Sequence, residues 1–98
     1  IGEIGIGLYA ARAYLARAGT PETAADLARH TLVTSLDGIE AIEAAAGVGV
    51  LLDRRVLRYR TDSLLARVAA VRAGIGIGPC QHWLADRCHE IVRVLPAW

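Results

Sequence analysis

Short apolar runs alternate along this chain with segments of helical periodicity. The apolar runs have the length and the isoleucine, valine and leucine content of β-strands, and they cover residues 4–9, 31–34, 56–60, 75–77 and 91–95. The segments between them are rich in alanine and leucine, with arginines spaced to face solvent. Because strands that alternate with helices are typical of α/β layers, the pattern predicts an α/β fold with a largely parallel sheet flanked by helices.

Glycine, proline and capping side chains mark the expected helix boundaries. Gly19 follows an alanine-rich run over 11–18 and predicts that a first helix ends there. Thr20 and Pro21 supply a cap and a first helical residue for a second helix that ends near His30. Three further helical segments are predicted: about two turns within a loop over 37–49, a helix after 61–63 that ends at Gly74, and a helix from Pro79 to about Arg87.

The charge balance argues against nucleic-acid binding by this chain. Its 98 residues include 11 basic ones, all arginine, against 10 acidic ones, a formal net charge of +1, whereas phosphate binding needs clustered positive charge. The 54% hydrophobic content excludes a disordered chain. No apolar run approaches the ~20 residues of a membrane-spanning helix. A strand-like segment at each end leads us to expect one domain or less, cut from a longer chain.

Three blocks of sequence follow one another in a specific order. The blocks are YLARAGTP (14–21) with DLARH (26–30), then RTDSLLARVAAVRAGIGIGP (60–79), then LAD (84–86) with IVRVLP (91–96). In this order they resemble the effector-binding domain of LysR-type transcriptional regulators. The resemblance covers most of the chain, but residues 36–53 match no pattern of that family.

The resemblance implies a fold, a function and partners. Residues 1–98 would form the second of two α/β subdomains, a Rossmann-like unit of the type II periplasmic-binding-protein fold. They would help to sense a small, anionic co-inducer in the cleft between the subdomains. DNA would be bound only by a winged helix-turn-helix outside this chain, with no membrane contact, and the protein would be a cytoplasmic homo-oligomer.

The candidate ligand-binding residues stand at predicted strand ends and at one helix start. They are Thr34, Ser35, Arg60, Thr61, Asp62, Ser63, Pro79, Cys80 and Gln81. In open α/β sheets ligands bind beyond the carboxyl ends of the strands, so we expect these residues to form one wall of a cleft whose other wall lies outside the chain. The resemblance also places the turn 61–63 at the border of the inducer cleft.

Each of these positions also has a purely structural interpretation. The turn 61–63 supplies a helix N-cap worth ~1 kcal/mol, and the same helix end would attract a carboxylate. Arg60 either binds a carboxylate in a bidentate fork or lies solvated at a sheet edge. Thr34 and Ser35 are either loop residues or cleft residues. The sequence leaves both interpretations open.

Cys80 and Cys88 are expected to be reduced structural thiols. On a helix over 80–88 they would lie ~12 Å apart, beyond the reach of a disulfide. Their spacing with His82 and His89 does not reproduce the paired ligands of a zinc site. We therefore predict no metal and no cofactor.

No catalytic motif is present in the sequence. Gly74, Gly76 and Gly78 lack the G-x-G-x-x-G pattern of a nucleotide site and are predicted to allow close packing of a helix on a strand. A G-x-S-x-G nucleophile elbow is also missing. An enzyme is therefore not expected, and a small enzyme fragment ranks last. The alternative function is half of a type II periplasmic solute-binding protein, which shares the fold.

Overall fold

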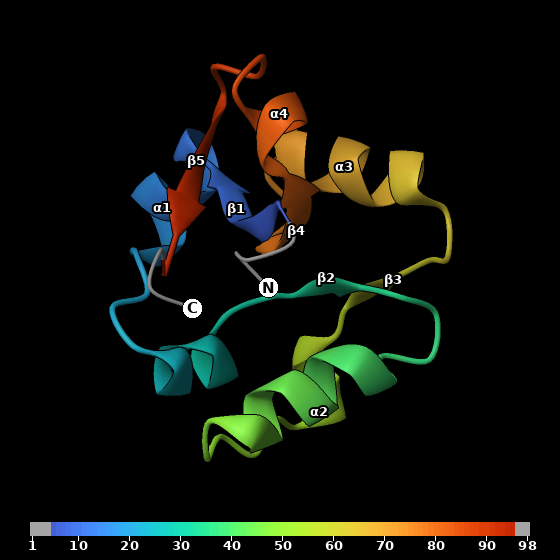
Figure 1. Ribbon diagram of the computed structural model, residues 1–98. Helices are drawn as coiled ribbons and strands as arrows, with labels where there is room; N and C mark the ends of the chain where they lie inside the picture. Colours follow the sequence, from blue (N-terminus) through green and yellow to red (C-terminus); the bar gives the residue numbers. More distant parts are fainter. Residues whose placement is uncertain (1–4, 96–98) are drawn as a thin grey trace.

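Helices and short strands alternate in the computed structural model, which describes residues 5–95 (Figure 1). The strands are β1 (Ile6–Ala11), β2 (Val33–Thr34), β3 (Tyr59–Arg60), β4 (Gly78–Gln81) and β5 (Ile91–Val94). The α-helices are α1 (Arg12–Ala18), α2 (Ile39–Gly47), α3 (Leu64–Arg72) and α4 (His82–Ala85), and the 3-10 helices are η2 (Ala24–Arg29) and η3 (Arg54–Val56). The predicted α/β class is confirmed. Ile4 and Pro96, which belong to the sequence patterns above, lie outside the described residues.

The prediction of a largely parallel sheet is wrong. β1 lies between β4 and β5 and pairs antiparallel with both, so that Leu8 faces Pro79 on one side and Val94 on the other. The short β2–β3 ladder is parallel, and a parallel bridge from Leu32 to Ile77 joins it to the start of β4. Two strands run parallel when a helix connects them and they are neighbours in the sheet. α1 leads from β1 to a strand that does not neighbour it, so β1 is free to run against β4 and β5.

The segment around Pro79 is a strand, where the sequence predicts the start of a helix. β4 is an end strand of the three-stranded sheet, a position that tolerates the missing N–H of proline. The helix begins three residues later and ends at Ala85 rather than near Arg87. Cys80 therefore lies on a strand, and the helical spacing assumed between Cys80 and Cys88 does not apply.

Other predictions fail at their boundaries: the strand predicted over 75–77 is β4, and the strand predicted over 31–34 shortens to β2. Thr20 and Pro21 precede the second helix without capping it, because Thr23 is the cap of η2 and forms a capping box with Asp26. The strand predicted over 56–60 shortens to β3, since residues 54–56 form η3. The helical turns predicted within 37–49 are confirmed as α2, which is nine residues long.

α1 ends and α3 begins where the sequence predicts. Gly19 follows α1 with a φ of 87°, a left-handed conformation that glycine adopts without strain. Ser63 is the N-cap of α3, because its Oγ accepts the Ala66 N–H at 3.2 Å. Gly74, with a φ of 82°, ends the same helix. These signals are local, and each is satisfied within one turn of the chain.

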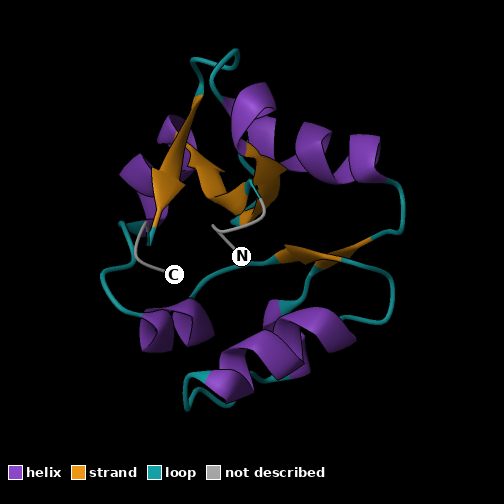
Figure 2. Cartoon of the chain, viewed as in Figure 1, coloured by secondary structure: helices purple, strands orange, loops and turns teal. Residues whose placement is uncertain are grey.

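The core forms where α3 packs against β4, β1 and β2. Figure 2 shows α3 above β2 and β3, with α2 below them. Gly78 allows the close approach, since a Cβ there would lie 2.8 Å from Val71 Cγ2 and 2.9 Å from Val33 Cβ. The predicted role of the glycines in helix–strand packing is thereby confirmed at Gly78.

Candidate functional site

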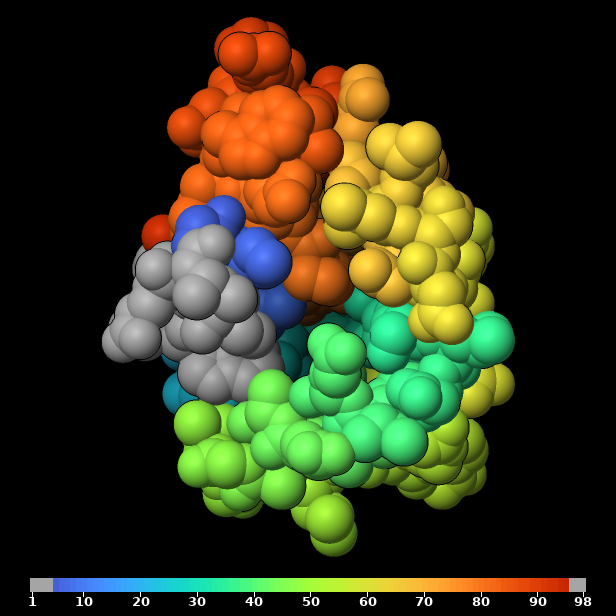
Figure 3. Space-filling view, turned by 45° about the vertical axis from the view of Figure 1, so that its right-hand side comes forward, coloured from blue at the N-terminus to red at the C-terminus, as the bar shows by residue number. Residues whose placement is uncertain are grey.

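A cavity of about 470 Å³ opens between α3 and β4 on one side and β2 and α2 on the other. Figure 3 shows this face of the molecule, hollowed between the yellow and orange residues of the upper part and the green residues of α2. The apolar part of its lining includes Leu8 from β1, Leu27 from η2, Leu32 beside β2 and Leu64 from α3. A cavity of this size and lining is typical of sites for small molecules.

Six of the nine candidate residues predicted from the sequence line this cavity. They are Thr34, Ser35, Asp62, Pro79, Cys80 and Gln81. They come from the end of β2, the turn before α3 and β4, which the fold brings together although they are far apart in sequence. The remaining three, Arg60, Thr61 and Ser63, flank Asp62 in the chain without lining the cavity.

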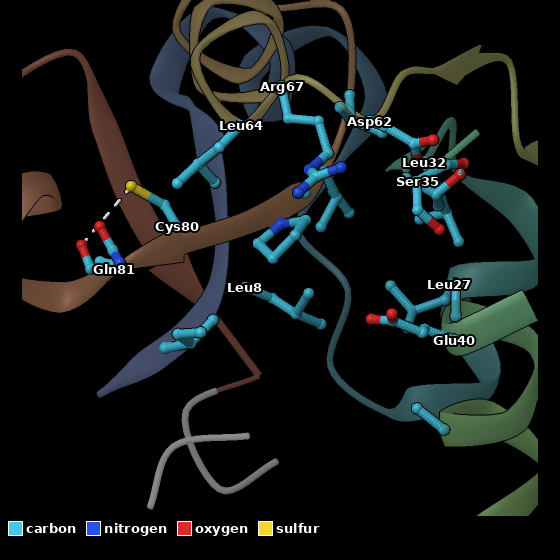
Figure 4. Close-up of a pocket in the computed structure, with 18 of the residues that line it drawn as sticks. Leu8, Leu27, Leu32, Ser35, Glu40, Asp62, Leu64, Arg67, Cys80 and Gln81 are labelled. Atoms are coloured by element: carbon cyan, nitrogen blue, oxygen red, sulfur yellow. Dashed lines mark hydrogen bonds between the residues drawn. The ribbon is translucent and has the colours of Figure 1, made fainter. Parts of the chain in front are cut away.

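Hydrogen bonds hold several polar groups of the lining in place. Asp62 Oδ1 accepts the Leu36 N–H at 2.9 Å and so ties the loop after β2 to the start of α3. Thr34 Oγ1 donates to the Ser35 carbonyl oxygen at 3.0 Å. On β4, Cys80 Sγ donates to the Gln81 carbonyl oxygen at 3.5 Å, drawn as a dashed line in Figure 4.

Two charged residues of the cavity were missed by the sequence analysis. Arg67, half-buried on α3, extends into the cavity (Figure 4). Its Nη1 donates to the Thr61 carbonyl oxygen at 2.6 Å. Its position one turn after Leu64 on a helix was a signal for it, because residues three apart share a helix face. Glu40, exposed in the first turn of α2, points into the cavity from the other side. It lies in the segment that matched no family pattern, so the sequence contained no signal for it.

Cys80 lines the cavity with a buried thiol. Its side chain is buried, and burial followed by the neighbouring Cys88 raises the pKa of the Cys80 thiol above its usual value. Both cysteines are free thiols. Within residues 5–95 no three histidine, cysteine or acidic side chains are grouped so that they could hold a metal ion. No helix in that range is long and apolar enough to cross a membrane.

The comparisons with known proteins agree on one family. The family model of the LysR substrate binding domain matches residues 1–98. Among solved structures, this chain is similar to the regulatory domain of CrgA, a LysR-type transcriptional regulator from Neisseria meningitidis. The two are 19% identical with a TM-score of 0.72, and the match covers 94% of this chain and 47% of the CrgA domain. A comparison with curated protein sequences found no significant match.

Two other regulators have the same fold. The regulatory domain of AphB in Vibrio vulnificus is 21% identical with a TM-score of 0.70, over 93% of this chain and 49% of its own. The effector domain of the transcriptional regulator AmpR of Pseudomonas aeruginosa is 24% identical with a TM-score of 0.61, over 93% of this chain and 43% of its own. The chain thus spans about half the length of the regulatory domains that it resembles.

Proposed function

This chain belongs to the family of LysR substrate-binding domains, and from that premise we propose that it forms the second α/β subdomain of an effector-binding domain. Its function is to contribute one wall of a cleft that binds a small, anionic effector. The first subdomain and a DNA-binding winged helix-turn-helix belong to the longer protein. The chain itself catalyses no reaction and needs no cofactor.

The cavity at the ends of β2 and β4 carries this proposal. Its polar residues come from the end of β2, from β4 and from the turn before α3, and ligands of α/β sheets bind at strand ends and helix starts. Apolar side chains form most of the remaining lining, which suits a small organic molecule. An open cavity on one subdomain is also what a cleft between two subdomains leaves when one wall is viewed alone.

We assign the nine candidate residues two kinds of role. Thr34, Ser35, Asp62, Pro79, Cys80 and Gln81 would touch the effector from the cavity wall. Thr61 and Ser63 would act as positioning residues, because Thr61 holds the Arg67 side chain and Ser63 caps the helix that carries it. Arg60, exposed at the end of β3, would reach an effector group at the mouth of the cleft.

Effector binding would change DNA binding by stabilising one conformation of the protein over another. An effector held between two subdomains favours the relative arrangement in which both walls contact it. In a cytoplasmic homo-oligomer, that arrangement sets the spacing of the DNA-binding domains. The effector therefore needs no direct contact with DNA.

The test is ligand binding to the full-length protein that carries this chain. A thermal-shift screen would use benzoate, butanoate, succinate, L-valine and L-leucine as probes, and we expect at least one to raise the unfolding midpoint. Ala44→Leu, which fills the cavity from α2, should abolish that shift, whereas Ala46→Leu on the exposed side of the same helix should preserve it. An Ala44→Leu protein that responds to the probe like the parent would contradict the proposal.

A further inference from the structure

Charged groups stand on two sides of the cavity. Arg67 is the one cation among the described residues that line it, and Glu40 and Asp62 are its two acids. Figure 4 shows the Arg67 guanidinium entering from α3 and the Glu40 carboxylate entering from α2 across the open space. Within residues 5–95 no ion pair joins Arg67 to either acid. The two charges therefore face the same space without neutralising each other.

These three charged groups differ in how many hydrogen bonds they make within the protein. Asp62 Oδ1 already accepts the Leu36 N–H, and Arg67 Nη1 already donates to the Thr61 carbonyl oxygen. Arg67 retains donors on its other nitrogens, since a guanidinium carries five N–H groups. Among the described residues, no hydrogen bond or ion pair reaches the Glu40 carboxylate. Arg67, Glu40 and the second carboxylate oxygen of Asp62 thus remain for a ligand.

The sign of these charges restricts the ligand. A ligand that is only anionic meets Arg67 but also faces the carboxylates of Glu40 and Asp62. A ligand that is only cationic meets Glu40 and Asp62 but also faces the Arg67 guanidinium. A molecule with one anionic and one cationic group pairs with both walls, and charge-assisted hydrogen bonds are the strong ones.

We propose that the effector is a small zwitterion of the amino-acid class, with its carboxylate on Arg67, its ammonium group toward Glu40 and an apolar side chain among Leu8, Leu27 and Leu32. This inference rests on the proposed function, because it describes the ligand of the same cavity. It keeps the anionic group of that proposal and adds a cationic one, so that the ligand carries no net charge.

Matched probes separate the two charges. L-valine, L-leucine and L-phenylalanine would each be compared with the acid that lacks the amino group and with the amine that lacks the carboxylate, using calorimetric titration of the full-length protein. For L-leucine these partners are 4-methylpentanoate and 3-methylbutylamine. We expect at least one amino acid to bind about tenfold or more tightly than either of its partners.

Variants assign each charge to its residue. Glu40→Gln should remove the preference for the amino acid over the matching acid, whereas Glu43→Gln, exposed on the same helix and outside the cavity lining, should retain it. Arg67→Met should lower the affinity for the amino acid and for the acid by about tenfold each and leave the affinity for the amine unchanged. Arg67→Lys should restore part of the lost affinity. Because Glu40 is exposed, Glu40→Gln is expected to fold.

The outcomes separate a failure of the zwitterion proposal from a failure of the proposed effector-binding function. If each acid binds as tightly as its parent amino acid, if Glu40→Gln leaves the preference unchanged, or if none of the nine probes binds, the zwitterion is overturned. The proposed function survives these results whenever a simple carboxylate such as benzoate or succinate still stabilises the protein and Ala44→Leu abolishes that effect. It fails together with the inference only when those carboxylates are inactive too.

Discussion

Tyr14 Oη lies 2.7 Å from His30 Nδ1, and both side chains are buried. The Thr31 N–H donates to the same Tyr14 oxygen at 3.2 Å, so we assign the tyrosine proton to the bond with His30. His30 is then a neutral imidazole with its proton on Nε2. The pair links α1 to the segment between η2 and β2, and in this assignment the imidazole that accepts the tyrosine proton is uncharged.

The neutral His30 predicts a loss of stability in mild acid. Burial, and secondly the charge of Arg29, lowers the pKa of His30 in the folded protein, with Asp26 acting in the opposite direction. A lowered pKa in the folded state means that the stabilisation is complete above the unfolded pKa of about 6.5 and is lost as the pH falls through the folded value. We expect the unfolding midpoint to fall as the pH drops below about 6.5, and His30→Asn to reduce that slope. His89→Asn, at an exposed histidine, is the control, and an unchanged slope in His30→Asn would contradict the assignment.

Gly76 predicts a large cost for a single methyl group. A Cβ at this position would lie 2.3 Å from the Thr31 carbonyl oxygen, which belongs to the backbone and cannot rotate away. Gly76→Ala should therefore lower the free energy of unfolding by about 2 kcal/mol or more, measured by urea denaturation. Gly47→Ala, in α2 with no atom within 4 Å, is the control and should be neutral or stabilising. Equal stability of the two variants would argue against the close contact of these two segments.

The parts of the fold predicted from the sequence are those decided by local chemistry. The end of α1 depends on the left-handed conformation of Gly19, and the start of α3 depends on the Ser63 cap, both of which are determined within one turn. The direction of β1 depends on β4 and β5, which follow it by many residues. The strand at Pro79 is likewise a consequence of pairing with Leu8. Periodicity contains no information about which strand becomes the neighbour of which.

The same distinction applies to the candidate site. Ser35 and Asp62 could be predicted because each follows or precedes a recognisable element, and the fold places both at one cavity. Glu40 and Arg67 could not be paired from the sequence, because they face one cavity only through the placement of α2 and α3 on either side of β2 and β3 (Figure 1). A residue at an element end is visible in a sequence, whereas two helix faces that share a cavity are not.

Ser63 and Ser35 are expected to separate stability from binding. Ser63 Oγ caps α3, so Ser63→Ala should lower the free energy of unfolding by about 1 kcal/mol. Ser35 Oγ makes only a 3.5 Å contact with Asp37, so Ser35→Ala should change stability by less than about 0.5 kcal/mol. Affinity for the best probe of the thermal-shift screen should fall more in Ser35→Ala, because this residue lines the cavity. Chemical denaturation and calorimetric titration of both variants provide the comparison, and a larger stability loss in Ser35→Ala would contradict it.

Exposed leucines at the start of α3 predict self-association of the 98-residue chain. Leu65 is 80% exposed, Leu64 beside it is 45% exposed, and Leu36, on the loop tied to Asp62, is 60% exposed. Neighbouring apolar side chains of this size are typical of surfaces that contact another protein. Light scattering should report a mass above that of the monomer at micromolar concentration, and Leu65→Glu should lower it. Leu51→Glu, at an exposed leucine after α2, should not, and a monomeric parent chain would refute the prediction.

The Cys80 thiol is expected to react slowly, and its rate of modification should show whether the cavity is occupied. Its side chain is 1% exposed, and burial raises the pKa of the thiol, so little thiolate forms near pH 8. In a Cys88→Ser background, which leaves Cys80 as the one thiol of this chain, a disulfide reagent should react on the order of a hundredfold more slowly with the folded protein than with the urea-unfolded one. A bound ligand should slow the reaction further, because Cys80 lines the cavity that the ligand fills. Labelling of the folded protein at the unfolded rate would show that Cys80 is not packed as described, and protection by a ligand that Ala44→Leu no longer binds would place that ligand beside Cys80.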